Sequence, residues 1–273
     1  MFKSDLINYK GCPLKILGGQ PSYHSDKMQI IKSSLFEKFP ELVFGLSTKI
    51  GLNRRTPFYF NQSYTVGDDP KIVKENREAF YDALGLSANQ IAIQKQVHSD
   101  IVTIVESPGQ QNESDAMITT VKGIGLAIST ADCVPIFIYD EKQKVIAAVH
   151  SGWRGTQKRI LEKTISILKQ EFNSSPKNLN IYIGPSISQK NYEVGKEVAS
   201  LFESKFVKEF SGKLFLDVLA VNLELILGAG VDSKNVEVSP LCSYNEKELL
   251  HSYRRDGKDS GRSHGILLMR DAQ

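Results

Sequence analysis

The sequence is poor in cysteine and in long apolar runs, and each shortage excludes a class of protein. Its three cysteines, Cys12, Cys133 and Cys242, are odd in number and far apart, which excludes a disulfide framework and indicates a reducing compartment. No stretch approaches the roughly 20 apolar residues of a membrane span, and the first residues lack the apolar core of a secretory signal. We therefore expect a cytoplasmic protein that does not enter a membrane.

A large excess of charge of either sign is also missing. The formal net charge is only +3 for 273 residues, from 34 basic and 31 acidic side chains. This balance cannot create the broad basic field of a general nucleic-acid binder, so any bound anion is expected to be small and held locally. The composition, 41% apolar and 24% charged, is typical of globular proteins. Because repeats and linkers are absent, we expect one domain over residues 1–273.

The motifs of several large enzyme classes are absent as well. The sequence has no G-x-x-x-x-G-K-[ST] phosphate loop, no H-E-x-x-H zinc helix, no G-x-S-x-G nucleophile turn and no C-x-x-C pair. The H-x-E and P-C-x-x-C motifs of zinc nucleobase deaminases are missing too. Any deaminase chemistry must therefore use another scaffold.

Hydrophobic periodicity predicts helices around a β-rich centre, and therefore an α/β fold. Six short apolar runs separated by turn residues predict six strands within 91–151. A helix is predicted over 70–84, with Pro70 in its first turn, after an irregular segment at 53–67. A second helix is predicted to begin near Gly155. The remaining expected elements are strands at 41–49, 179–185, 235–239 and 265–270 and helices at 194–205, 217–228 and 245–252.

Three chemically active residues lie at the ends of predicted strands: His98 in KQVHSD, Cys133 in STADCVPIF and His150 in AAVHSGWRGT. Sheets present functional groups at strand ends, so we expect strand pairing to bring the three together. Two imidazoles and a thiolate match the ligands that zinc prefers, and three protein ligands leave a fourth position open, as in catalytic sites. Zinc would lower the pKa of water in that position towards about 7.

Other interpretations of these residues stay open. Cys133 can be a nucleophile with a histidine as its base. Two histidines and a cysteine also describe a copper site, for which Met117 is a candidate axial ligand. The ion can instead be structural in a non-catalytic binding module, or the three residues can be ordinary core residues. Asp115 and Asp132 are candidates for acid–base work or for binding the ligand imidazoles, and Asp115 is our choice for proton transfer.

Two segments are candidates for binding a small anion. SGWRGT at 151–156 joins a predicted strand to a helix, so backbone N–H groups and Arg154 can surround an anion. SYRRDGKDSGRSH at 252–264 places Arg254, Arg255 and Arg262 in a glycine-containing loop, and guanidinium groups suit phosphate recognition. Each segment can equally be a turn or a solvated run of charges.

The chain resembles the YfiH/YlmD-type laccase-domain family of purine nucleoside phosphorylases, also called polyphenol oxidase-like. Six segments carry the resemblance, which runs from about residue 42 to 273: KQVHSD, ESDAMIT, STADCVPIFIYD, AAVHSGWRGT, IGPSIS and CSY…SYRRDGKDSGR. It implies a single-domain α/β (α+β) sandwich of mixed β-sheets flanked by helices, similar to the catalytic domain of a deamidating cysteine toxin. It also implies a zinc ion held by His98, Cys133 and His150, with copper less favoured.

The resemblance further implies phosphate-dependent cleavage of adenosine, inosine, guanosine and S-methyl-5′-thioadenosine, with adenosine deamination as a side activity. The expected partners are then a purine nucleoside and phosphate. Two stretches depart from the family pattern: arginine and aromatic residues replace small ones at 51–67, and Ser263-His264 follow Arg262. The preferred nucleoside therefore stays open.

Overall fold

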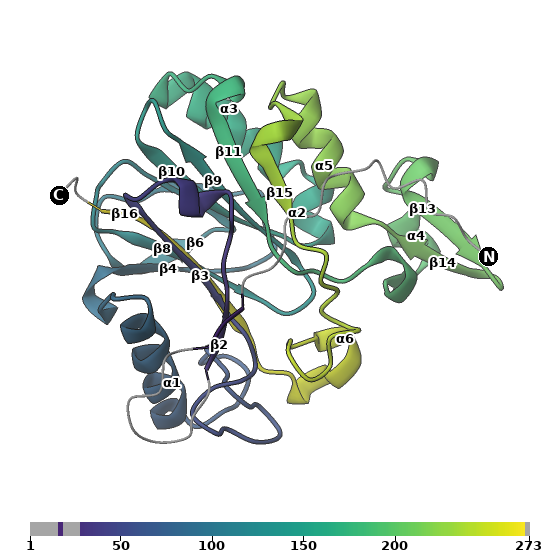
Figure 1. The fold of residues 1–273 in the computed structure, drawn as a ribbon. Coiled ribbons are helices and arrows are strands. Elements are labelled where there is room, and N and C mark those ends of the chain that lie inside the picture. Colours follow the sequence, from purple (N-terminus) through teal and green to yellow (C-terminus); the bar gives the residue numbers. More distant parts are fainter. Residues whose placement is uncertain (1–15, 19–27, 271–273) are drawn as a thin grey trace.

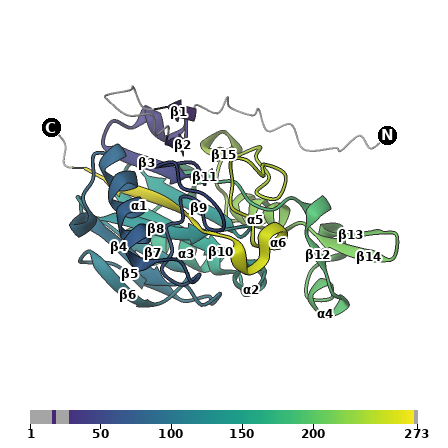
Figure 2. The same cartoon turned by 90° about the horizontal axis from the view of Figure 1, so that it is seen from below.

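The computed structural model describes residues 16–18 and 28–270 and has four layers. Two β-sheets pack face to face (Figure 1). Helix α1 (Pro70–Ala83) covers the outer face of one sheet, and helices α3 (Ile160–Phe172) and α5 (Val218–Gly228) cover the outer face of the other. The view from below shows the same layering, with a small third sheet projecting to one side (Figure 2). This arrangement confirms the expected α/β sandwich flanked by helices.

Sixteen strands form three sheets within the described residues. Their bounds are β1 (Ile16–Gly18), β2 (Gln29–Ile31), β3 (Leu42–Ser47), β4 (Ile91–Lys95), β5 (Val102–Ile104), β6 (Gly109–Glu113), β7 (Ala116–Thr119), β8 (Gly125–Thr130), β9 (Val134–Asp140), β10 (Val145–Ser151), β11 (Leu179–Ile183), β12 (Glu193–Val194), β13 (Val207–Phe210), β14 (Lys213–Leu216), β15 (Val236–Val238) and β16 (Ser263–Met269).

Two of the sheets are mixed. The seven-stranded sheet has the order β1-β2-β3-β16-β8-β4-β6, with antiparallel pairs as far as β8 and parallel pairs from β8 to β6. The six-stranded sheet has the order β15-β11-β9-β10-β7-β5, with a parallel pair at each edge. The projecting sheet, β12-β14-β13, is antiparallel.

Apolar side chains fill all three interfaces between the layers, as the alternation of side chains along a strand requires. Phe44 and Phe137 meet between the two sheets, with ring centroids 5.0 Å apart. On the far side of the six-stranded sheet, Ile136 packs in one cluster with Ile165 of α3. On the far side of the other sheet, Phe80 of α1 belongs to a third cluster. No helix of the described residues has the length and apolar character that crossing a membrane requires.

Many local predictions are confirmed. Helix α1 begins with Pro70 after Asp69, whose side chain accepts a hydrogen bond from the N–H of Lys71 at 2.8 Å. All six strands expected within 91–151 are present, and the last strand is β16. Strand β6 was not expected, because its sequence GQQNE lacks the β-branched and aromatic residues by which strands are recognised.

The helix expected from Gly155 is divided into two. Helix α2 (Trp153–Gln157) ends early, Arg159 adopts a left-handed conformation with φ of 60°, and α3 then begins at Ile160. Helix α3 buries Leu161, Ile165 and Leu168 along one face, as hydrophobic periodicity predicts, but α2 is a separate helix of only five residues. The helix dipole available to an anion at 151–156 is correspondingly small.

The helices predicted at 194–205 and 245–252 are wrong. In the first segment, Val194 pairs with Leu214 of β14, so only the single helical turn α4 (Lys196–Ala199) remains. The second segment forms turns. The side chain of Arg255 binds the carbonyl groups of Leu250 within it and of Ser243 and Tyr244 just before it, and the helical turn α6 (Tyr253–Asp256) follows. Strand pairing at Val194, and the hydrogen bond from the N–H of Lys49 to the carbonyl oxygen of Leu249, thus engage backbone groups that a continuous helix would need.

Candidate active site

Strand register brings the residues of the predicted metal cluster together. In the antiparallel pair β9 and β10, His150 lies opposite Pro135, so the end of β10 reaches Cys133 at the start of β9. His98 follows β4 of the other sheet, in a left-handed conformation with φ of 57°. The ligand atoms of His98, Cys133 and His150 all lie within 4.8 Å of one another, and Cys133 Sγ is 3.8 Å from His98 Nε2.

Asp115 binds His150 through two hydrogen bonds on the side away from the cleft. The N–H of His150 donates to the carbonyl oxygen of Asp115 at 2.7 Å, and its Nδ1–H donates to Asp115 Oδ1 at 2.8 Å. The other carboxylate oxygen accepts from Ser99 Oγ–H at 2.7 Å. Asp115 is fully buried and does not line the cleft described below. It therefore orients His150 with Nε2 towards the cluster, and proton transfer from Asp115 to a substrate would have to pass through His150.

Hydrogen bonds and neighbouring charges favour the ionised forms of Cys133, His150 and Asp115. Burial on its own would raise the pKa of the Cys133 thiol, but the facing His150 and the hydrogen bonds from both imidazoles lower it. Burial likewise opposes the charged form of His150, yet Cys133 and Asp115 raise the pKa of His150. Burial would raise the pKa of Asp115 as well, but the hydrogen bonds from His150 and Ser99 lower it to about 2. A thiolate, the form that binds metal ions, is therefore favoured at Cys133.

The donor set fits a metal ion of borderline softness such as zinc. Gly152 leaves the space that this requires, because a Cβ atom there would lie 2.9 Å from both Cys133 Sγ and His98 Cδ2. Among the described residues, this is the one group of three or more candidate ligands. Met117, the candidate axial ligand for copper, is instead fully buried between the two sheets. The group can hold a metal, and which metal it holds stays a prediction.

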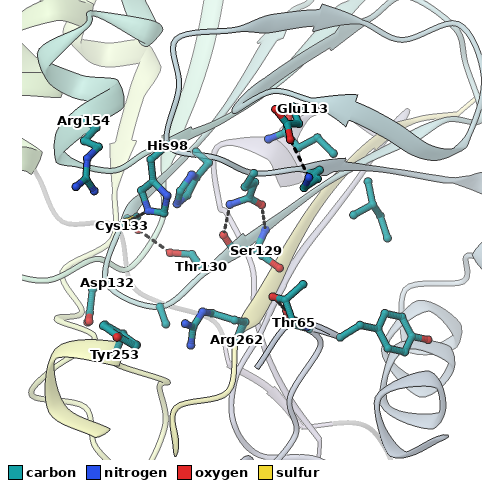
Figure 3. Close-up of a pocket in the computed structure, with 18 of the residues that line it drawn as sticks. Thr65, His98, Glu113, Ser129, Thr130, Asp132, Cys133, Arg154, Tyr253 and Arg262 are labelled. Carbon is teal, nitrogen blue, oxygen red and sulfur yellow. Dashed lines mark hydrogen bonds and ion pairs between the residues drawn. The ribbon is translucent and has the colours of Figure 1, made fainter. Parts of the chain in front are cut away.

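A cleft of about 1020 Å³ opens in front of the cluster (Figure 3). Three of the four arginines predicted to bind phosphate, Arg154, Arg254 and Arg262, line it. Each stacks on an aromatic side chain of the cleft, at 4.4 Å for Arg154 on Trp153, 5.0 Å for Arg254 on Tyr192 and 5.4 Å for Arg262 on Tyr253. Such stacking holds a guanidinium in place. Backbone carbonyl groups already accept from Nη1 of Arg254 and from Nη1 of Arg262, so the remaining N–H donors are the ones available to an anion.

The cleft arginines also differ from other arginines in their partners. Within the part of the chain that the structure describes, the arginines paired with carboxylates are Arg54, Arg159 and Arg255. Those that line the cleft have no such partner. Arg262 is partly buried, and a partly buried arginine without a carboxylate is typical of a site that binds an anion, whereas Arg154 and Arg254 are exposed.

Arg255, the fourth predicted phosphate ligand, lies outside the cleft. Its guanidinium donates to the carbonyl groups of Ser243, Tyr244 and Leu250 and pairs with Asp256 at 2.7 Å. These bonds hold the turns before α6 in place. The structure thus corrects the prediction for Arg255, because a guanidinium occupied by three carbonyl groups and a carboxylate has little left for phosphate.

Asp132 connects the cysteine to the arginine-bearing segment. Its backbone has φ of 90°, a left-handed conformation that is uncommon outside glycine. Its carboxylate accepts hydrogen bonds from Ser243 Oγ–H and from the N–H of Arg254, both at 2.6 Å. Asp132 lines the cleft, but its hydrogen bonds fix α6 beside Cys133.

Sequence reasoning missed Arg77, which lines the cleft from α1. Its guanidinium lies over the ring of Tyr64 at 4.4 Å, and its Nε–H donates to the carbonyl oxygen of Gln62 at 2.7 Å. A signal was present, since Arg77 is four residues from both Val73 and Tyr81, which are buried. A charge at the centre of an apolar helix stripe indicates a polar site under that helix.

Comparison with known proteins identifies the family. Residues 44–270 match the family model described as "Multi-copper polyphenol oxidoreductase laccase". The chain belongs to this laccase-domain family. A purine nucleoside phosphorylase of Corynebacterium glutamicum is 36% identical over 232 residues, which are 82% of this chain and 92% of the relative. Adenosine deaminase RL5, from an unknown prokaryotic organism, is 31% identical over 216 residues, 72% of this chain and 82% of the relative.

The fold is shared with solved structures of the laccase-domain family. The crystal structure of the hypothetical protein YfiH from Bacillus licheniformis superposes with a TM-score of 0.82 at 26% identity, covering 90% of this chain and 97% of that one. The family resemblance and its fold are thus confirmed. Both relatives carry the names of enzymes, which confirms the expectation that this chain is an enzyme.

Proposed function

We propose that the protein is a zinc-dependent purine nucleoside phosphorylase. It would cleave adenosine, inosine, guanosine and S-methyl-5′-thioadenosine with phosphate, and deaminate adenosine as a side activity. The observation that carries the proposal is that a His-Cys-His group and three arginines without carboxylate partners share one cleft. The names of the two relatives, a purine nucleoside phosphorylase and an adenosine deaminase, support a purine nucleoside as substrate. A reduced Cys133 suits the cytoplasmic setting that we expect.

In this proposal Arg154, Arg254 and Arg262 bind and orient the phosphate. One phosphate oxygen forms a bond to C1′ of the ribose while the bond from C1′ to the purine nitrogen breaks. The electron pair of that bond leaves with the purine, which takes up a proton. The negative charge of the phosphate faces the positive charge that develops at C1′, and the arginines keep it in position without reorganisation.

His98, Cys133 and His150 are the proposed zinc ligands, with Asp115 as the residue that orients His150. When bound, zinc supplies a Lewis acid that can polarise a purine or activate water for attack at C6 of adenine. The aromatic side chains of Trp153 and Tyr253 offer the purine flat surfaces on the wall of the same cleft. One site can therefore serve phosphorolysis and deamination.

One observation favours a second candidate, a cysteine hydrolase or deamidase. Cys133 Sγ lies 3.8 Å from His98 Nε2, and its pKa is lowered by His150 against the effect of burial. A thiolate beside an imidazole is the arrangement of a cysteine nucleophile and its base.

Metal analysis combined with product analysis distinguishes the two. We expect about one zinc per chain, ribose 1-phosphate formed from adenosine only when phosphate is present, and loss of both zinc and activity in Cys133→Ala. Zinc binding without any ribose 1-phosphate would exclude phosphorolysis. Activity that survives chelation but is abolished by thiol alkylation would establish the cysteine hydrolase instead.

A further inference from the structure

The cleft has a second cationic end that one phosphate does not account for. We define the outer end by Ser63, Tyr64, Thr65 and Arg77, all of which line the cleft. In the close-up, Thr65 lies beyond Arg262 as seen from Cys133 (Figure 3). We propose that this outer end binds the phosphate group of a nucleoside 5′-phosphate, so that purine nucleotides are ligands of the cleft together with purine nucleosides.

Arg77 is separate from the arginines beside the metal cluster. Burial lowers the pKa of Arg77, and the ionisable groups that raise it again are Tyr81 and Tyr64. Burial also lowers the pKa of Arg262, but there the groups that raise it are Cys133, Asp132 and Tyr253. Arg77 thus has its own surroundings, in which no carboxylate of the described residues pairs with it. Its Nε–H is used by Gln62, while both terminal nitrogens keep their donors for a ligand.

Hydroxyl groups and a fixed loop complete the outer end. Ser63 Oγ and Thr65 Oγ1 lie 2.9 Å apart, and the backbone beside them is held by Asn61, whose Nδ2–H₂ donates to the carbonyl oxygen of Ser63 at 2.8 Å. Asn61 is fully buried and is itself bound through its backbone carbonyl by Asn76 at 2.8 Å. A guanidinium with neighbouring hydroxyl donors on a fixed backbone is the usual environment of a bound phosphate.

Charge counting supports a second anion. Four arginines line the cleft, where Asp132 and a Cys133 thiolate offset two of their charges, the proposed zinc ion adds two, and Lys95 is neutralised by Glu113 at 2.7 Å. A single phosphate carries about two negative charges at pH 7 and a nucleoside carries none, so the proposed substrates leave part of this positive charge unmatched. Because Arg77 is partly buried and an unmatched charge there is costly, a second anionic group on the ligand is favoured.

A nucleoside 5′-phosphate supplies that group at the right place. The inference rests on the proposed function for the position of the nucleoside, whose base and C1′ lie at the metal end of the cleft. In the proposed arrangement the 5′ carbon is directed away from the metal cluster, towards Arg77, which lines the same cleft. The cleft volume of about 1020 Å³ lies at the upper end of the roughly 300–1,000 Å³ of small-molecule sites, which leaves room for a 5′-phosphate beside the nucleoside.

Calorimetric titration of the zinc-loaded full chain in phosphate-free buffer tests the proposal. Inosine and inosine 5′-monophosphate are the probes, since neither is a substrate for adenosine deamination. We expect the nucleotide to bind at least about tenfold more tightly than the nucleoside. Arg77→Gln should abolish this preference while changing the affinity for inosine less than about twofold.

Matched variants locate the effect. Arg55→Gln removes the same charge from an exposed arginine outside the cleft and should leave the preference intact. Arg154→Gln should leave it intact as well, because Arg154 belongs to the metal end. Arg77→Lys, which keeps the charge and the packing of the stem, should retain part of the preference if Arg77→Gln does not fold.

The inference and the proposed function can fail separately. Equal affinities of the wild type for nucleoside and nucleotide would overturn the inference. So would equal weakening of both ligands in Arg77→Gln, or loss of the preference in Arg154→Gln. Nucleotide binding that depends on Arg77 without any formation of ribose 1-phosphate would refute the proposed function and leave the inference standing.

Discussion

A methyl group at Gly152 should weaken metal binding while the fold persists. Gly152 has φ of −76° and ψ of 173°, which alanine adopts without strain. The substitution therefore acts only through the contacts of the added methyl group. The added Cβ would lie 2.9 Å from Cys133 Sγ and 2.9 Å from His98 Cδ2, closer than real Cβ contacts. Both neighbours are proposed ligands, so relief of the contact must move them apart. Overpacking of this kind costs about 1–3 kcal/mol, equivalent to about 5- to 150-fold in zinc affinity.

Competition with a chelator of known affinity measures the effect, and thermal unfolding of the metal-free protein reports on the fold. Gly228→Ala is the matched control, because a Cβ at Gly228, the last residue of α5, meets no atom within 4 Å. It should bind zinc as the wild type does and unfold at the same or a slightly higher temperature. Zinc affinity of Gly152→Ala within about twofold of this control would refute the proposed ligand geometry.

Three further predictions concern the surroundings of the cluster, the arginines and a buried histidine. Asp115→Asn should lower zinc affinity by about 10- to 100-fold in the same competition assay, because His150 loses its charged acceptor. Arg154→Ala should raise the KM for phosphate about tenfold and the KM for nucleoside less than twofold. Arg255→Ala should instead leave the KM for phosphate unchanged and lower the free energy of unfolding by about 1–3 kcal/mol, since three carbonyl groups lose their donor. Burial holds the pKa of His264 well below its usual value of 6.5, so the unfolded chain binds a proton that the folded chain rejects as the pH falls below 6.5. Between about pH 7 and about pH 5.5, urea unfolding should show a loss of stability that is roughly 1 kcal/mol smaller in His264→Leu than in the wild type, and an equal loss in the variant would contradict this account.

Local chemistry determined much of the secondary structure. An aspartate followed by Pro70 set the start of α1, and apolar runs such as PIFIYD formed strands because β-branched and aromatic residues suit a pleated, buried backbone. Where tertiary contacts supplied the hydrogen bonds, local reasoning failed. Val194 joined a sheet instead of a helix, and the turns at 245–252 are held by Arg255 from a later part of the chain.

The sequence alone was sufficient to select His98, Cys133 and His150, because few residue types bind metals and each of the three lies at the end of a predicted strand. Their closeness was decided by strand register, which places the end of β10 beside the start of β9. The direction of each neighbouring side chain was likewise decided by the tertiary structure. The carboxylate of Asp115 binds His150 on the side away from the cleft. The side chain of Arg255 binds backbone carbonyl groups inside the protein, whereas that of Arg262 lines the cleft. A sequence lists the groups that can do the chemistry, but only the packed sheets determine which way each one points.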